Sequence, residues 1–388
     1  MKKLILPLYL WLHRTLLKFC WNIFTLVPLD KKKVVFSNFN GGVYGDNPKY
    51  IAEELLRRQL NWKLYWTSAS DYELPKGVLP VRPNTILFVW HMATAVAWVD
   101  NTRKLYYFKK RPGQFYVQTC HGGPGPKKIE KDCEELLSKE YVAYAKIDSK
   151  HIDLMLSSCK WQSNCFRNAF WYDGPILEKG LPKYDAYFED LTLCREKVQN
   201  YFKLPKDIKF VVYAPTFRES RRTDMYKLDY EQLLVSLGKR FGGKWAVLVC
   251  LHPNIDRQNY PLNYTDRILN TSAYGNMQDL LAASDVIISD YSGCVTEFVM
   301  IERPGFLYIE DYEDAKQERG YYYDLKELPL PLAFSNEELM KNIEIFDEEK
   351  YKQGCRTFCD WMQFYEGGHA SEAVVDIILE HSQKLSNH

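Results

Sequence analysis

The sequence predicts an α/β protein made of two domains that lie side by side. Its 388 residues exceed the size at which a single hydrophobic core usually stops growing. Apolar residues make up 46% of the chain and charged residues 26%, which is typical of globular rather than disordered proteins. Short apolar runs alternate with helical stretches in two successive cycles, as in parallel sheets covered by helices. The break between the cycles is expected near residues 183–206.

The first cycle is expected to contain an early helix and five strands. The helix covers about 49–58, because Asp46 or Asn47 can cap it and Pro48 suits its first turn. The strands are expected at 33–39, 62–68, 85–90, 114–119 and 151–158.

The second cycle follows a helix expected at 194–202. Its strands are expected at 208–217, 244–253, 266–270, 285–292 and 305–311, and its helices at 230–241, 277–284 and 294–302. Ligands of parallel sheets bind at the carboxyl ends of the strands, so two such domains predict a site in the cleft between them.

The first 32 residues are expected to form an amphipathic helix that associates with a membrane. The longest charge-free stretch, 19–29, is shorter than the roughly 20 residues that cross a bilayer. Trp11 and Trp21 are expected at head-group depth. The apolar face consists of Leu12, Leu16, Phe19, Ile23 and Leu26. One alternative is a helix packed on the body of the protein; a signal peptide would need a small-residue cleavage site after the apolar stretch.

Charge and cysteine content narrow the class of partner. Residues 1–33 contain seven Lys or Arg and one acid, a charge of +6, so the other residues carry −5 of the total +1. A basic end on a mildly acidic body indicates an anionic membrane surface, whereas nucleic acid would require a basic stripe on the body. The ten cysteines contain no CxxC pair, so we expect reduced, cytosolic thiols and no metal site.

A polar turn between a strand and a helix is expected to bind a phosphate group. Its residues are Ser289, Asp290, Tyr291, Ser292 and Gly293. Glu297 follows about one turn into the helix, within reach of a ribose diol. Asn276 caps the preceding helix, and its loop could line a base pocket. The alternative is a capping turn with Ser292 as N-cap and Glu297 in solvent.

A histidine in a glycine-rich turn after the 114–119 strand is the candidate base. Gly122 and Gly123 let substrate approach the backbone, so His121 could accept a proton from an attacking hydroxyl. Lys127 and Lys128 could hold anionic groups nearby. A loop histidine without a role is the alternative.

Two further strand ends carry phosphate-binding side chains. His252 lies at the end of the 244–253 run, directly after the strand core at 245–251, and could donate to a diphosphate oxygen, or only cap a neighbouring loop. Arg218 offers a guanidinium fork of the kind that phosphates favour, although a solvated run of charges explains it equally well.

These clusters together resemble the CDP-glycerol glycerophosphotransferase family of teichoic acid primases and polymerases. The matching segments are "HGGPGPKKI" from His121, "YAPTFR" at 213–218, "LHP" at 251–253 and "LLAASDVIISDYS" at 280–292, supported by "DNPKYIAEEL", "RGYYYDL" and "GGHASEAVVDII". The resemblance covers nearly all of 34–380. Cys120, Gly123 and Gly293 depart from the tryptophan, threonine and serine usual there, which leaves the shape of the acceptor pocket open.

The resemblance implies a GT-B fold with two Rossmann-like domains that face a central cleft. We expect a membrane-associating segment at 1–32, an acceptor domain at 33–190 and a donor domain with C-terminal helices at 191–388. His121 is similar to the family's catalytic base, His252 to its donor-phosphate histidine, and residues 289–292 to its diphosphate loop. Arg218 and Glu297 are our additions, for phosphate and ribose.

The implied activity is transfer of glycerol phosphate from CDP-glycerol to a hydroxyl of a lipid-linked saccharide or polyol-phosphate acceptor, with release of CMP. Teichoic acid or capsule-type polymer synthesis at the cytoplasmic face of the bacterial membrane would use this reaction. We expect no tightly bound cofactor, although Mg²⁺ could associate loosely with the donor. The alternatives are CDP-ribitol as donor, a sugar-nucleotide glycosyltransferase, and a non-catalytic membrane-bound scaffold.

Overall fold

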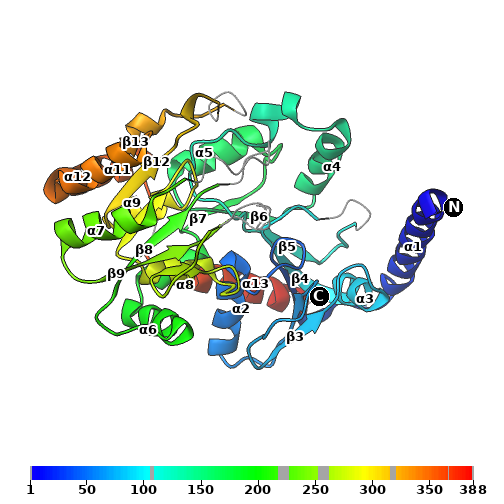
Figure 1. The fold of residues 1–388 in the computed structure, drawn as a ribbon. Helices are drawn as coiled ribbons and strands as arrows, with labels where there is room; N and C mark the ends of the chain where they lie inside the picture. Colours follow the sequence, from blue (N-terminus) through cyan, green and yellow to red (C-terminus); the bar gives the residue numbers. More distant parts are fainter. Residues whose placement is uncertain are drawn as a thin grey trace.

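The computed structural model describes residues 2–104, 109–216, 227–251, 262–314, 320–365 and 367–386, with side chains from residue 9 onward. This part of the chain forms two parallel sheets, the first from strands of the N-terminal half of the sequence and the second from strands of the C-terminal half (Figure 1). The expected α/β class with two successive cycles is therefore confirmed.

The first sheet has seven strands in the order β3-β2-β1-β4-β5-β6-β7. The pairs are parallel, and the central residues Val34 and Val35 are fully buried. Burial of both faces explains the continuous apolar runs in the sequence. The strands are β1 (Asp30–Ser37), β2 (Lys63–Thr67), β3 (Val78–Val81), β4 (Ala95–Asp100), β5 (Phe115–Gln118), β6 (Leu154–Ser157) and β7 (Ile176–Glu178).

The second sheet has six parallel strands in the order β10-β9-β8-β11-β12-β13. The strands are β8 (Lys209–Ala214), β9 (Trp245–Val249), β10 (Ile268–Asn270), β11 (Val286–Ser289), β12 (Gly305–Tyr308) and β13 (Leu332–Ala333). In both sheets the chain starts at a central strand, moves outward and then returns to the other side of it. This switch of direction creates a crevice at the carboxyl ends of the strands.

Helices cover both sheets. They are α1 (Lys2–Phe24), α2 (Asp46–Arg57), α3 (Ile86–Thr94), α4 (Lys139–Ser149), α5 (Lys160–Ala169), α6 (Leu191–Phe202), α7 (Tyr230–Phe241), α8 (Met277–Ala283), α9 (Val295–Met300), α11 (Asn336–Glu344), α12 (Glu348–Met362) and α13 (Ala370–Ser386). Three short 3₁₀ segments are η1 (Glu130–Leu136), η2 (Pro182–Tyr187) and η3 (Leu325–Glu327).

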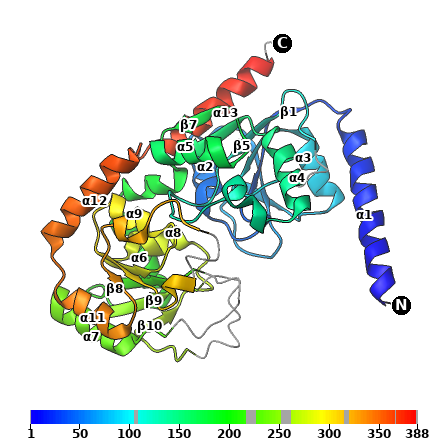
Figure 2. The same cartoon turned by 90° about the horizontal axis from the view of Figure 1, so that it is seen from above.

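The last helix returns to the first sheet. Although α13 follows the second sheet in sequence, it packs on α2, η2 and β1 (Figure 2). Its residues Val374, Val375 and Ile378 are fully buried in the same core as Val34. The two halves of the protein, each built on one sheet, are thus joined by the chain that crosses between them near residue 190 and by this returning helix.

The run expected as a strand at 85–90 is a helix, and that prediction is wrong. The Thr85 hydroxyl accepts a hydrogen bond from the backbone N–H of Phe88 at 3.1 Å and caps α3. Because α1 covers part of the outer surface of α3, this helix lacks the polar face that would have indicated it. Of the strands that the sequence reading missed, β4 follows α3 directly and is buried throughout, and the others are the short strands β3, β7 and β13.

The expected cap of the first helix is also wrong, and so is the alternative in which Ser292 is an N-cap. Asp46 and Asn47 belong to the first turn of α2, where Gly45 is the N-cap residue and no side chain caps the helix. Cys294, rather than Ser292, is the N-cap of α9. The expected cap at Asn276 is confirmed, since its side-chain oxygen accepts from the N–H of Gln278 at 3.2 Å.

Helix α1 has features of both interpretations of its sequence, a helix packed on the body of the protein and an amphipathic helix with an exposed apolar face. Leu17 and Trp21 are buried, and the Trp21 ring lies 6.0 Å from that of Trp98, so Trp21 cannot lie at head-group depth as expected. The other end of the helix stands clear of the body (Figures 1 and 2). All five residues of the expected apolar face, together with Trp11, are exposed. No helix in the described ranges is long and apolar enough to span a membrane.

Candidate active site

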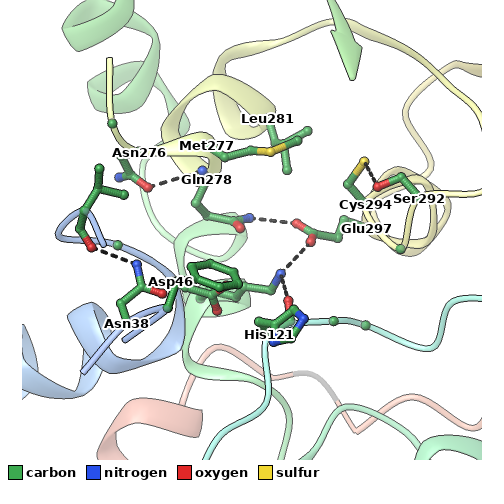
Figure 3. A pocket seen from close by; sticks show the side chains of 18 residues that line it. Asn38, Asp46, His121, Asn276, Met277, Gln278, Leu281, Ser292, Cys294 and Glu297 are labelled. Atoms are coloured by element: carbon green, nitrogen blue, oxygen red, sulfur yellow. Dashed lines mark hydrogen bonds and ion pairs between the residues drawn. The ribbon is translucent and has the colours of Figure 1, made fainter. Parts of the chain in front are cut away.

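A cavity of about 290 Å³ lies between the two halves (Figure 3). Residues at the carboxyl ends of β1 and β5 line one side, and the starts of α8 and α9 line the other. The first half contributes Asn38, Phe39, Asp46, His121, Gly122, Gly123 and Lys183, and the second contributes Asn276, Gln278, Ser292, Gly293, Cys294 and Glu297, among others. The site therefore lies where the strand-end rule predicts it.

His121 is exposed at the mouth of this cavity, just after β5. Its Nδ1 lies 3.1 Å from the carbonyl oxygen of Asn101. A carbonyl can only accept, so in the neutral ring Nδ1 carries the proton and Nε2 has the lone pair. The backbone of the turn is held by Asn47, whose side-chain amide donates to the carbonyls of Thr119 and Cys120 at 3.3 and 3.0 Å. His121 thus has the tautomer and the position that a general base requires.

The two halves touch through their glycines. A Cβ on Gly123 would lie 2.4 Å from the Tyr184 hydroxyl and 3.2 Å from Thr296, and one on Gly293 would lie 3.5 Å from the nitrogen of Gly123. Gly122, in contrast, has open space where its side chain would be. Gly123 therefore permits close contact between the halves, and Gly122 leaves room beside His121.

A buried ion pair joins the halves behind His121. Lys183, in η2, places Nζ 3.0 Å from Glu297 Oε1, and the two side chains are only 10% and 1% exposed. The other carboxylate oxygen accepts from Tyr187 at 2.7 Å and Gln278 at 2.9 Å. Burial alone would lower the pKa of Lys183, but the carboxylates of Glu297 and Asp46 outweigh it and raise that pKa. Lys183 is therefore held in its charged form.

Asp46 adds a second carboxyl group to the cavity wall. Its Oδ1 accepts from the N–H of Asn47 at 2.6 Å, and the residue adopts a left-handed conformation (φ 55°). Burial raises the pKa of Asp46, against the opposing effects of Lys183, the Asn47 N–H and His121. The sequence reading missed Asp46 and Lys183 as site residues. A signal for Asp46 existed, because it ends the glycine-rich loop that follows the β1 strand.

The predicted phosphate turn faces the cavity only in part. Ser292 and Gly293 line it, whereas Ser289 is buried and its hydroxyl donates to the carbonyl of Ala214. Asp290 is buried too, and its Oδ2 accepts from the N–H and the hydroxyl of Thr216, both at 2.9 Å. Side chains before Ser292 therefore shape the turn from behind, while Ser292 and Gly293 present its outer surface.

Each remaining predicted residue lines the cavity, lies outside its lining, or lies outside the described part of the chain. Asn276 and Glu297 line the cavity as expected, although Glu297 already has three partners and is not in solvent. Lys127 and Lys128 lie outside the cavity lining. The Lys127 ammonium lies 3.9 Å from the centre of the Tyr291 ring, and the N–H of Lys128 donates to the Gly320 carbonyl at 3.1 Å.

His252 and Arg218, which we predicted to bind phosphate, lie outside the described residues. Within the described ranges, no group of three His, Cys, Asp or Glu side chains could hold a metal ion. The cavity therefore offers an imidazole, hydrogen-bonding groups and a fixed ion pair.

Comparison with known proteins gives this cavity a context. Residues 20–380 match the family described as CDP-Glycerol:Poly(glycerophosphate) glycerophosphotransferase. The teichoic acid poly(glycerol phosphate) polymerase of Bacillus subtilis (strain 168) is 28% identical over 91% of this chain, and the match spans only 49% of that protein. The teichoic acid poly(ribitol-phosphate) polymerase of Bacillus spizizenii is 26% identical over 95% of this chain and 59% of its own length.

Solved structures of other proteins are similar to this chain as well. A structure of the wall teichoic acid polymerase TagF, obtained after a soak with CDPG, has a TM-score of 0.84, 25% identity and coverage of 96% of this chain and 95% of that one. A putative UDP-N-acetylglucosamine 2-epimerase from Listeria monocytogenes has a TM-score of 0.52 at 13% identity, with coverage of 90% and 97%, and shares the fold alone. The expected GT-B-like arrangement is thus found in both.

Proposed function

We propose, from the premise that the chain belongs to the CDP-glycerol:poly(glycerophosphate) glycerophosphotransferase family, that it transfers glycerol phosphate from CDP-glycerol to a hydroxyl of a lipid-linked acceptor. The observation that carries the proposal is the position of the His121 ring, whose Nδ1 lies 3.1 Å from the Asn101 carbonyl oxygen at the mouth of a cavity between two parallel sheets. The similarity to TagF, which was soaked with CDPG, supports this donor.

In the proposed reaction, the acceptor hydroxyl donates a hydrogen bond to Nε2 of His121. As its oxygen bonds to the β-phosphorus of CDP-glycerol, its proton passes to Nε2. The bond from that phosphorus to the bridging oxygen breaks, and CMP leaves with this oxygen. Such transfers depend mainly on positioning and charge neutralisation. His252 and Arg218 stay predictions for the donor phosphates, Mg²⁺ stays a prediction for the diphosphate, and Lys127 and Lys128 stay predictions for the acceptor side.

The contacts of Glu297 indicate a different role from the predicted contact with the ribose of the donor. Its carboxylate is occupied by Lys183, Tyr187 and Gln278, so a ribose diol would compete with these partners. We assign Glu297 first to holding the halves together at the cavity and only then to contact with the donor. Ser292, Gly293 and Asn276, which also line the cavity, are the described residues that we assign to contact with the donor.

The direct test measures CMP release by the full chain with each of two donors. CDP-glycerol and CDP-ribitol are supplied separately with a lipid-linked saccharide that already carries one polyol phosphate. CMP release from CDP-glycerol alone supports the proposal. Release from CDP-ribitol alone would replace it with the ribitol activity of the Bacillus spizizenii relative, and release from neither would favour a non-catalytic scaffold.

The proposed location is the cytoplasmic face of the membrane, with α1 lying in the interface. Phe19 is 61% exposed, Leu12 53% and Leu26 84%, all on the face that the sequence predicts to be apolar. Burial of each such side chain contributes about 1.5–3 kcal/mol, so Leu12→Ser/Phe19→Ser should weaken binding to anionic vesicles at least tenfold. Equal flotation of the variant and the natural protein would contradict this location.

A further inference from the structure

A second cavity lies at the amino ends of the strands of the first sheet, opposite the end that borders the active-site cavity. It has a volume of about 360 Å³ and is lined by the starts of β1 and β2, the end of α3 and the link between α1 and β1. The active-site cavity lies at the other ends of these strands, and the eight residues of β1 span roughly 25 Å. The two cavities are therefore separate.

The floor of this cavity holds a buried lysine that makes no ion pair with the described residues. Lys33 is only 5% exposed, and its Nζ donates to the Thr94 hydroxyl at 2.7 Å. In the described part of the chain no carboxylate oxygen lies within 4.0 Å of that nitrogen. The rings of Tyr65 and Trp90 lie 5.9 and 5.7 Å away and stabilise the charge without neutralising it. Burial, together with the charge of Lys63, lowers the pKa of Lys33 despite Asp30.

The charges around Lys33 leave an excess of one. Asp30 also lines the cavity, but its carboxylate accepts from Lys63 at 2.8 Å and from the N–H of Lys32 at 3.1 Å. Two lysines and one aspartate thus give the cavity wall a net positive charge. The His91 side chain is 7% exposed, and its Nδ1 is buried with no hydrogen-bond partner among the described residues. Buried charge and unpaired polar atoms are costly, so a bound anion that meets them would be stabilising.

The mouth of the cavity is apolar and continuous with α1. Val27 and Pro28 line it, and Leu26 beside them is 84% exposed, the highest value among the exposed large hydrophobic residues. A phosphate on Lys33 would therefore have apolar side chains directly outside it. Phospholipids combine these two features, since their acyl chains begin next to the phosphate.

From this juxtaposition we infer a binding site for a phosphate ester, with the phosphate on Lys33 and the acyl chains of an anionic phospholipid against Leu26 and Val27. The inference goes beyond the transfer reaction. It rests on the proposed function only in placing α1 at a membrane. In such a complex a defined head-group site would fix the rotation of α1, and with it the height of the catalytic cavity above the lipid.

The test compares Lys33→Met with Lys32→Met, which removes the same charge from an exposed position on the same strand. Vesicles of phosphatidylcholine with and without phosphatidylglycerol are sedimented with the full chain. A charge-assisted contact in a buried site is worth roughly tenfold to a hundredfold in affinity. We expect this loss for Lys33→Met and less than a threefold loss for Lys32→Met. Equal losses, or none, would overturn the site because they would reflect only overall charge.

A second arm separates a lipid from a soluble ligand. If inorganic phosphate raises the Tm of the natural protein but not of Lys33→Met while the two bind vesicles equally, the lipid assignment is overturned in favour of a soluble phosphate ester. If Lys33→Met does not fold, Val27→Asp and Val27→Asn serve instead. We expect at least tenfold weaker vesicle binding for the aspartate than for the asparagine. Equal binding by these two would overturn the site. CMP release, measured with detergent-dispersed acceptor, distinguishes loss of this site from loss of catalysis.

Discussion

Two buried lysines of the first half face two different cavities, and their surroundings are opposite. Lys183, beside the catalytic cavity, is paired with Glu297 at 3.0 Å, and its pKa is raised. Lys33, at the other edge of the sheet, has a hydroxyl and two rings as neighbours, and its pKa is lowered. A buried charge that has its partner within the chain joins structural elements, whereas one that lacks a partner is available to a ligand. Burial alone therefore does not reveal the role of a lysine.

The largest expected effect is on catalysis, at the residue that distinguishes the first cavity. His121→Ala should lower the rate of CMP release about 10²–10⁴-fold, because it removes the proton acceptor. Donor affinity, measured by calorimetry, should change little. His151→Ala is the control, since this histidine lies outside the lining of both cavities. Turnover by His121→Ala within threefold of the natural rate would remove its assignment as base.

The second prediction concerns the two lysines themselves. Lys183→Met leaves the Glu297 carboxylate buried without its counter-ion and should lower the free energy of unfolding by about 3–5 kcal/mol. Lys33→Met leaves no buried carboxylate behind, so we expect no loss of stability, or a gain. Urea denaturation measures both variants.

The control for this pair is the double variant Lys183→Met/Glu297→Gln. Its neutral amide can still bond Tyr187 and Gln278, so it should recover most of the loss. Equal destabilisation by the two single lysine variants would show that the contrast between them is not electrostatic.

The third prediction is that the cavities respond to pH in opposite directions. Burial and the Lys33 charge lower the pKa of His91 to about 4 from 6.5. The unfolded chain then binds the proton more readily, so stability is complete above pH 6.5 and is lost as the pH falls towards 4. The loss approaches roughly 3 kcal/mol at 1.36 kcal/mol per unit. His91→Phe should lack it, which urea denaturation at pH 7.5 and pH 5 would show; a constant difference between the variant and the natural protein would contradict this.

Asp46 supplies the opposite slope. Its pKa is raised above 3.8, chiefly by burial, so the folded state binds the proton more readily than the unfolded state. Its contribution is present at low pH and is lost as the pH rises above 3.8. Relative to Asp46→Asn, the natural protein should therefore lose stability between pH 4 and pH 7. A gain over that range would mean that Lys183 and His121 outweigh burial.

The sequence supports the first cavity better than the second, for physical reasons. His121 could be predicted because a strand, a glycine turn and the carboxyl-end rule all lie within one local stretch. Lys183 could not, since its role depends on Glu297, which is far away in sequence and in the other half. Ser289 and Asp290 were placed in the right turn, but which side chains of that turn point outward depends on β8. Lys33 is one of three consecutive lysines, and only the fold of β1 against α3 buries it rather than its neighbours.

The smallest expected effects compare matching helix caps beside the two cavities. Thr85 caps α3, which borders the Lys33 cavity, and Asn276 caps α8, which borders the catalytic cavity. Replacing either with alanine should cost about 1 kcal/mol of stability, because one backbone N–H loses its partner. Thr85 lines neither cavity, whereas Asn276 lines the catalytic cavity. Thr85→Ala should therefore leave donor affinity unchanged, while Asn276→Ala should weaken it, as calorimetry would show. Equal donor affinities of the two variants would mean that Asn276 acts only as a helix cap and that the nucleobase of the donor binds elsewhere along the cavity wall.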